Sequence, residues 1–226
     1  MESGETRELL FLIGAIFGIL EGKSMKAGVE NMGTNSVNQD QIYTYENYLT
    51  WRDEERWELI AGTAYAMTAP SRQHQQILGN LFLEFGNYLK GKQCEVYAAP
   101  FDVRLPHKNE TAKNSTTVVQ PDITVVCNRD KLDAKGCCGS PDLIIEILSP
   151  ATAGHDMIRK RRLYELNGVK EYWIVDPAHS IVTQFLLAGG EYGKMEFFDR
   201  ESEISPAIFP DLIIRLKEIF PPLADE

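Results

Sequence analysis

The sequence predicts a mixed α/β fold in which helices flank a central sheet, and two observations carry this prediction. Residues 142–148 are almost wholly apolar, which is typical of a strand buried on both faces of a sheet, and residues 171–176 predict a further buried strand. Between them, residues 151–167 predict a helix that ends at the stop signal Asn167-Gly168. A strand, a helix and a second strand in this order predict a right-handed crossover between parallel neighbours.

The segments before this crossover predict one hairpin and two helices. Polar and aromatic residues at 44–55 predict a short helix. Residues 57–67 predict two short strands around a turn at Gly62, where glycine supplies the backbone freedom. A longer helix follows, with Ser71 as its N-cap. Its apolar residues recur at helical spacing and predict one buried face: Ile77, Leu78, Leu81, Phe82, Phe85 and Leu89.

The remaining segments predict further strands. Residues 95–105 and 118–127 each predict one strand, and a polar loop over residues 106–117 separates them. After the crossover, residues 181–198 predict a hairpin turned at a glycine pair, and residues 204–216 predict one more strand or helix piece. Together these segments complete the mixed α/β order.

The chain of 226 residues has the length of a single domain, which we place at residues 41–226. Residues 1–40 are expected to form an N-terminal extension. Its apolar run, residues 9–20, is shorter than the about 20 residues of a membrane-spanning helix, and an acidic stretch stands where a signal peptide would be basic. We therefore expect no stable membrane association; a weak association is an alternative for this segment only.

The net charge of −10 counts against a simple nucleic-acid binder, whose phosphate contacts need Lys and Arg. It does not exclude a nuclease, because a carboxylate-lined metal site adds negative charge and a local basic patch can coexist with an acidic whole. The densest basic run is residues 159–162.

The four cysteines are expected to be reduced thiols of a cytoplasmic protein. Cys137 and Cys138 are adjacent, which is a poor geometry for a bridge between them. Neither these two nor Cys94 and Cys127 stand in a zinc-binding spacing with the four histidines.

Glu146 is the most informative polar residue, because it interrupts an apolar strand in which a charge is costly unless it is paired or bound to a metal. The alternative is a strand end at which Glu146 caps a neighbour or pairs with an Arg. Asp122 follows Pro121 and precedes an apolar run, and taken alone it fits an ordinary turn or strand-start aspartate equally well. Two carboxylates on neighbouring strands can, however, hold Mg²⁺, which prefers oxygen ligands.

A cation is also expected near a scissile phosphate. The residue two positions after Glu146, on the same strand face, is the uncharged Leu148. Asp156, Lys160 and Tyr164 are spaced by four and share one helix face, from which Lys160 can reach back to the carboxylates. The alternative for Lys160 is a solvated lysine paired with Asp156.

Glu58 and His74 are two further candidates. Glu58 lies in a strand-like segment between Trp57 and Leu59 and would complete a carboxylate-rich pocket. His74 lies one turn into the predicted helix, where it can contact a metal-bound water or a phosphate. A helix-face histidine with a local hydrogen bond is an equally good interpretation.

These motifs, in this order, resemble the Uma-two family of putative restriction endonucleases, in the superfamily named for its PD-(D/E)XK motif. The resemblance runs from about residue 44 to about residue 223. The matching pieces are WELIAG at 57–62, the helix start at 70–74, QPDI at 120–123, PDLIIEILSP at 141–150, then Asp156, Lys160 and Tyr164, and GVKEYWIVD at 168–176.

The resemblance implies a restriction-endonuclease-like core, with Asp122 as the motif's aspartate and Glu146 as its second acid. Asp142 also follows a proline, but it belongs to the same strand as Glu146. The motif's lysine would fall at Leu148, so Lys160 is taken as a migrated replacement. The implied catalytic set is Asp122, Glu146, Lys160 and Glu58, the metal ligands are Asp122 and Glu146, and the accessory residues are His74, Asp156 and Tyr164.

The resulting hypothesis is a Mg²⁺- or Mn²⁺-dependent endonuclease that hydrolyses DNA phosphodiester bonds. Cleavage of a duplex commonly uses two active sites, which favours a homodimer. The rival is an inactive nuclease fold that binds nucleic acid or a protein partner, favoured by Leu148 and by the acidic net charge. A third alternative is a structural partner protein, which predicts no metal binding at all.

Overall fold

The computed structural model describes residues 41–51, 55–149 and 153–221, and for residues 153–157 it describes the backbone alone. The predicted extension, residues 1–40, lies outside the described residues. The helices are α2 (Tyr45–Tyr48), α3 (Arg72–Leu89), α4 (Ala153–Asn167) and α5 (Leu216–Ile219), with a 3₁₀ turn η1 (Arg129–Lys131). Within the described part of the chain, no helix combines the length and the apolarity needed to cross a membrane.

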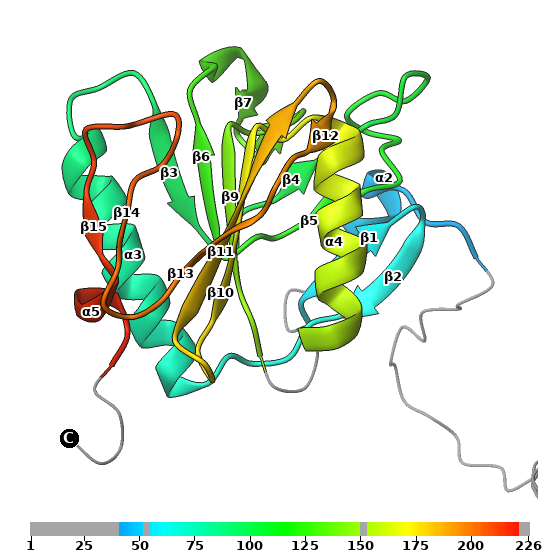
Figure 1. Ribbon diagram of the computed structural model, residues 1–226. Helices are drawn as coiled ribbons and strands as arrows, with labels where there is room; N and C mark the ends of the chain where they lie inside the picture. Colours follow the sequence, from blue (N-terminus) through cyan, green and yellow to red (C-terminus); the bar gives the residue numbers. More distant parts are fainter. Residues whose placement is uncertain (1–40, 52–54, 150–152, 222–226) are drawn as a thin grey trace, which may run out of the picture. The chain divides into compact units, whose positions relative to one another are not determined.

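The main sheet is mixed, as the sequence predicts, and its strand order is β12-β11-β10-β9-β6-β3, with β13 paired to β11 (Figure 1). Its two central strands, β9 and β10, are parallel and α4 lies between them in the chain, so the predicted parallel pairing with a helical connection is confirmed. The strands of this sheet are β3 (Glu95–Ala98), β6 (Ile123–Val126), β9 (Leu143–Ile147), β10 (Glu171–Asp176), β11 (Ile181–Ala188), β12 (Glu191–Tyr192) and β13 (Glu196–Phe198).

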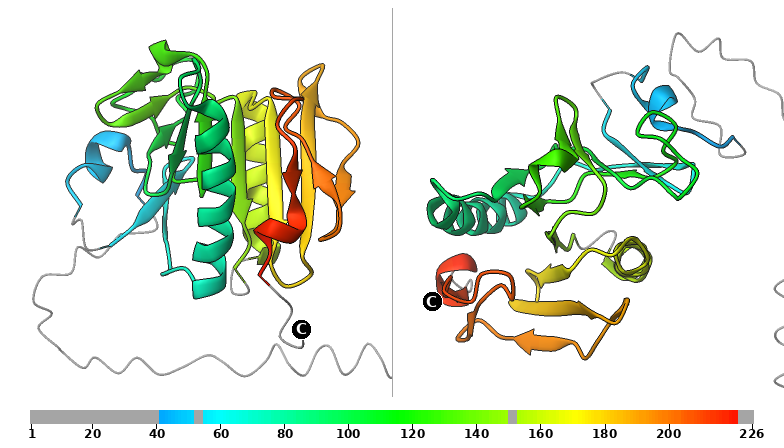
Figure 2. Two further views of the ribbon diagram at one scale, coloured as in Figure 1. Left: turned by 90° about the vertical axis from the view of Figure 1, so that its left-hand side faces the viewer. Right: turned by 90° about the horizontal axis from the view of Figure 1, so that it is seen from above.

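Helices α3 and α4 cover opposite faces of this sheet (Figure 2). Ile145 packs with the buried face of α3, whereas Ile144 packs with Tyr164 of α4. Because successive side chains of a strand point to opposite faces, Glu146 shares the α4 face with Ile144. The register of β9 therefore decides which helix can supply partners for the buried carboxylate.

A second sheet has the order β2-β1-β5-β4-β8-β7. Its strands are β1 (Trp57–Ile60), β2 (Thr63–Ala66), β4 (Val103–Arg104), β5 (Val118–Val119), β7 (Leu132–Asp133) and β8 (Gly136–Cys138). The hairpin of β1 and β2 is confirmed, and Gly62 has the positive φ of 80° that its turn requires. A separate pair joins β14 (Glu203–Ile204) to β15 (Ile214–Arg215), directly before α5.

Two segments that each predict a single strand are divided between the two sheets. Residues 95–105 form β3 and β4, and residues 118–127 form β5 and β6, so both predictions of one continuous strand are wrong. Proline has no N–H to donate to a ladder, and Pro100 and Pro121 mark the two breaks. Asp122 consequently lies where the chain passes from one sheet to the other.

The helix predictions are confirmed in position and corrected in length. Ser71 caps α3, because its hydroxyl oxygen accepts a hydrogen bond from the His74 N–H at 3.2 Å. Of the predicted helix over residues 44–55, the described residues form a single turn, α2, and residues 52–54 lie outside the described part of the structure. The predicted hairpin over residues 181–198 turns at the glycine pair between β11 and β12.

The hairpin of β7 and β8 has no counterpart in the predicted order, and Gly136 makes it possible. Its φ is 124°, and a Cβ there would lie 2.2 Å from the Asp102 carbonyl oxygen. We expect Gly136→Ala to lower the free energy of unfolding in urea by at least about 2 kcal/mol, because strain at such a backbone adds to the clash. As the control, Gly86→Ala within α3 meets no atom within 4 Å and should stabilise by up to about 1 kcal/mol; equal effects of the two changes would contradict this account.

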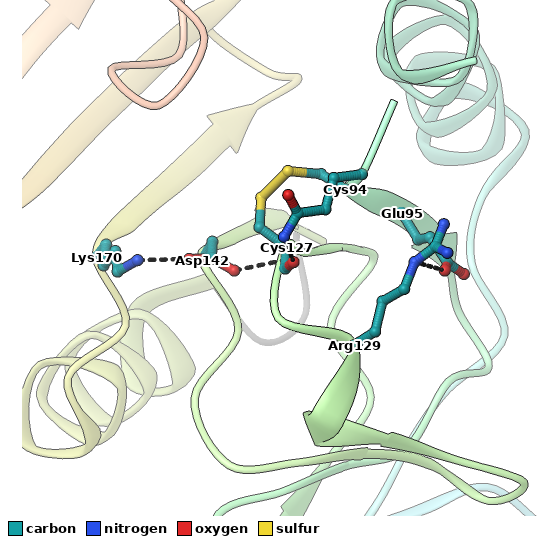
Figure 3. Close-up of a disulfide and its surroundings, with 7 residues drawn as sticks. Cys94, Glu95, Cys127, Arg129, Asp142 and Lys170 are labelled. Atoms are coloured by element: carbon teal, nitrogen blue, oxygen red, sulfur yellow. Dashed lines mark hydrogen bonds and ion pairs between the residues drawn. A yellow bond between two sulfur atoms is a disulfide. The ribbon is translucent and has the colours of Figure 1, made fainter. Parts of the chain in front are cut away.

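The expectation of four reduced thiols is wrong for one pair, because Cys94 and Cys127 form a disulfide (Figure 3). In the antiparallel pairing of β3 and β6, Glu95 stands opposite Val126, so the flanking cysteines become the next cross-strand pair. Cys137 is a buried free thiol and Cys138 is partly exposed. Sequence spacing could not show this pairing, which depends on the register of two strands.

Removing the disulfide is expected to destabilise the protein by about 2–4 kcal/mol, because it closes a loop between cysteines 33 residues apart. Urea unfolding of Cys94→Ser under non-reducing conditions measures the loss, and Cys138→Ser is the matched control for a cysteine that bridges nothing. An unfolding midpoint of the wild type that dithiothreitol leaves unchanged would contradict the prediction.

Candidate active site

Six of the seven residues singled out from the sequence meet around one cavity at the carboxyl end of β9. The cavity has a volume of about 160 Å³, and Glu58, His74, Asp122, Glu146 and Lys160 line it. Tyr164 lies next to the cavity, and its hydroxyl donates a hydrogen bond to Glu146. The side chain of the seventh residue, Asp156, lies outside the described part of the structure.

Lys160 lies between two carboxylates contributed by different sheets. Its Nζ is 3.0 Å from Glu58 Oε1 and 3.0 Å from Glu146 Oε1, and its side chain is 12% exposed. Burial alone would lower the pKa of Lys160, but Glu146 and Glu58 outweigh burial and hold this pKa above its ordinary value. The lysine is therefore a buried ammonium directed at the carboxylates, and the alternative of a solvated lysine is wrong.

Glu146 is surrounded by more negative than positive charge. Burial raises its pKa to about 7, Lys160 opposes this shift, and the carboxylates of Asp122 and Glu58 reinforce it. The Tyr164 hydroxyl donates a hydrogen bond to Glu146 Oε1 at 2.6 Å and favours the charged form. Lys160 thus contacts Glu58 and Glu146, while Asp122 contacts His74, and an added cation would relieve the repulsion among the three carboxylates.

Asp122 is held by two donors from elements on either side of it. Its Oδ2 accepts a hydrogen bond from the Ile147 N–H at 2.7 Å and lies 3.2 Å from His74 Nε2. Burial lowers the pKa of His74, but its hydrogen bond to Asp122 and the nearby negative charges raise the pKa above its ordinary value overall. His74 therefore contacts a carboxylate of the cavity, whereas the alternative was a local hydrogen bond on the helix face.

The donor set fits a hard divalent cation with water completing its shell. Within the described residues, no three His, Cys, Asp or Glu side chains are grouped closely enough to hold a metal ion by themselves. Mg²⁺ is usually bound through one or two carboxylates and keeps several waters. Asp122 and Glu146 supply the two carboxylates that such a site needs, and the nearby Glu58 adds further negative charge.

Asp142, the other aspartate that follows a proline, has a different role. Its Oδ2 accepts from the Cys127 N–H at 2.7 Å, and its Oδ1 pairs with Lys170 Nζ at 2.7 Å (Figure 3). Asp142 precedes β9, whereas the cavity lies beyond the strand's other end. Asp142 is therefore absent from the lining of the cavity, which includes Asp122.

Gln120 and Arg56 are residues of the cavity wall that sequence reasoning did not single out as site residues. The Gln120 N–H donates to Glu58 Oε1 at 2.9 Å, and its side-chain Oε1 accepts from Arg56 Nε at 3.1 Å and from Nη2 at 2.9 Å. Gln120 directly precedes Pro121 in an otherwise apolar run, and a polar side chain in such a run is a sequence signal for a specific hydrogen bond.

Comparisons with known proteins match this chain over most of its length. Residues 45–217 match the profile of the Uma2 family, described as putative restriction endonuclease. An uncharacterized protein of Synechocystis sp. is 29% identical over 138 residues, which are 60% of this chain and 69% of that protein. The crystal structure of a putative nuclease from Anabaena variabilis has a TM-score of 0.64 at 19% identity, covering 79% of this chain and 97% of that one, and it establishes the shared fold.

Proposed function

The chain belongs to the Uma2 family of putative restriction endonucleases, and from that premise we propose that it is a divalent-metal-dependent endonuclease that hydrolyses DNA phosphodiester bonds. The observation that carries the proposal is the buried cluster in which Lys160 contacts both Glu58 and Glu146 beside Asp122. A buried ammonium among carboxylates is costly to maintain as a purely structural device.

Each residue of the cluster has a proposed role. Asp122 and Glu146 would hold Mg²⁺ or Mn²⁺, and such an ion supplies charge neutralisation at a phosphate and a water of lowered pKa. His74 and the Ile147 N–H fix the orientation of Asp122, and Tyr164 fixes that of Glu146. Lys160 can donate hydrogen bonds to a phosphate oxygen or to the attacking water.

Glu58 has a supporting role in this proposal. It accepts hydrogen bonds from Lys160 and from the Gln120 N–H, and it thereby fixes the ammonium beside Glu146. Such orientation of a charged donor before substrate binds is what electrostatic catalysis requires.

The direct test is cleavage of supercoiled plasmid DNA by the purified full-length protein. We expect nicked or linear product with Mg²⁺ or Mn²⁺, no product with EDTA, and recovery when the metal is returned in excess. Absence of product with every divalent metal tried would overturn the proposal.

A binding module without activity is the second candidate, and the net charge of −10 together with Leu148 at the motif's lysine position favours it. Calorimetric titration with Mn²⁺, combined with the cleavage assay, distinguishes the nuclease from the binding module. We expect the wild type to bind the ion and Glu146→Gln to lose most of the affinity. Metal binding without cleavage would support the module, and metal binding undiminished in Glu146→Gln would contradict this assignment of the ligands.

A further inference from the structure

A second, larger cavity adjoins the candidate active site. It has a volume of about 770 Å³, and Arg56 and Gln120 line both cavities. Clefts of about 300–1,000 Å³ are the size that holds small organic ligands. We call this second cavity the aromatic groove, because five aromatic side chains line it: Tyr48, Trp51, Trp57, Tyr97 and Phe101.

The rings of the groove remain partly exposed although they contact one another. Trp51 lies 5.6 Å from Trp57, and Tyr97 stacks on Phe101 at 4.1 Å with an interplanar angle of 2°. All five side chains are intermediate in exposure. Partly exposed aromatic faces gathered in a cleft are surfaces on which planar groups stack.

The groove is lined by charges of both signs, with Glu55, Asp102 and Asp133 against Arg56 and Lys135, and Arg56 is the cation that also lines the active-site cavity. Within the described residues Arg56 forms no ion pair, and its two hydrogen bonds go to the neutral amide of Gln120. Asp102, an acid of the groove, is occupied by internal donors, namely the hydroxyls of Tyr45 and Tyr48 and the Gln120 amide. Arg56 therefore presents a positive charge where the two cavities meet.

We propose that the aromatic groove binds unpaired nucleotides of the DNA strand whose phosphate occupies the candidate active site. This inference rests on the proposed function and deepens it, because it names DNA with a single-stranded segment beside the cleaved bond as the substrate class. Arg56 contacts the backbone at the junction, and the unpaired bases stack on the aromatic rings. Base stacking of this kind tolerates any sequence.

The tryptophans provide a direct readout. The chain contains three, of which Trp51 and Trp57 line the groove and Trp173 is fully buried. The protein is titrated with an eight-nucleotide oligothymidylate in EDTA at low ionic strength, so that no cleavage occurs and phosphate contacts are weakly screened. We expect saturable quenching of tryptophan fluorescence, and weaker binding of a blunt DNA hairpin with the same number of phosphates.

Variants locate the binding. Trp51→Leu and Tyr97→Leu are each expected to weaken oligothymidylate binding by about tenfold, because one stacked base contributes about 1–3 kcal/mol; fluorescence anisotropy of a labelled oligonucleotide measures this without relying on Trp51. The matched control is Phe197→Leu, which removes an aromatic ring that is 66% exposed on β13 and outside the groove. Thermal unfolding of each variant checks that it is folded.

Three results would overturn the inference: no binding of the oligothymidylate, binding that both groove variants retain in full, or preference for the blunt hairpin. Because the titration contains EDTA, its outcome is independent of cleavage. Oligothymidylate binding without plasmid cleavage would support nucleotide binding by the groove and reject the nuclease activity. Cleavage without oligothymidylate binding would reject only the proposed role of the groove.

Discussion

Asp122→Asn is expected to lower the single-turnover rate of plasmid cleavage in Mg²⁺ by about 10²–10³-fold, the usual cost of removing one preorganised electrostatic group. Asparagine keeps an oxygen that can accept from the Ile147 N–H, so the local fold should survive. The substitution removes the negative charge that would hold the metal beside Glu146. Cleavage rates are measured on pre-formed enzyme–plasmid mixtures started by adding Mg²⁺.

Asp142→Asn is the matched control for this prediction. Asp142 also follows a proline and is buried, but it contacts Cys127 and Lys170 at the other end of β9. We expect Asp142→Asn to lower the melting temperature while leaving the cleavage rate of the folded protein unchanged. A wild-type rate in Asp122→Asn, or equal losses in the two variants, would refute the assignment of Asp122.

Lys160→Met is expected to have the largest effect on stability, a loss of about 3–5 kcal/mol in the free energy of unfolding, because it leaves a buried pair broken on one side. Glu58 and Glu146 would face each other and Asp122 with no ammonium between them. Mn²⁺ should restore more stability to this variant than to the wild type, since the ion supplies the missing positive charge. Urea unfolding with and without Mn²⁺ measures both quantities.

Arg162→Met controls for the loss of a cation from the same helix. Arg162 is exposed on α4, and a surface substitution of this kind should change stability by less than about 0.5 kcal/mol. A loss in Lys160→Met no greater than in Arg162→Met would show that the buried ammonium contributes little. Equal Mn²⁺ stabilisation of Lys160→Met and the wild type would contradict a metal site beside Glu146.

Local sequence patterns predicted the elements that frame the candidate site. The apolar runs of β9 and β10, with a helix and a glycine stop between them, determined the parallel crossover, because burial on both faces leaves a continuous apolar signature. The N-cap at Ser71 was also predicted from the sequence, because a capping side chain acts within one helical turn. Local patterns wrongly predicted one continuous strand around Pro100 and one around Pro121. In both segments the chain passes from one sheet to the other near the proline.

The candidate acids were also recognisable in the sequence. Glu146 was conspicuous because a carboxylate inside an apolar strand requires a partner, and family resemblance selected Asp122. The sequence did not identify Gln120 and Arg56 as residues of the site. Their contacts depend on how the second sheet packs against the first.

The sequence by itself determined the mixed α/β class and the parallel crossover and marked Glu146 as a candidate acid, because these follow from local periodicity and from the cost of burying charge, whereas Asp122 was proposed from the family resemblance. Only the tertiary structure decided that Lys160 contacts Glu58, 102 residues away, and that Cys94 is bonded to Cys127. Both contacts depend on strand register and on the packing of α4 against a sheet face. Such long-range geometry is selected by the whole fold, and no window of sequence contains it.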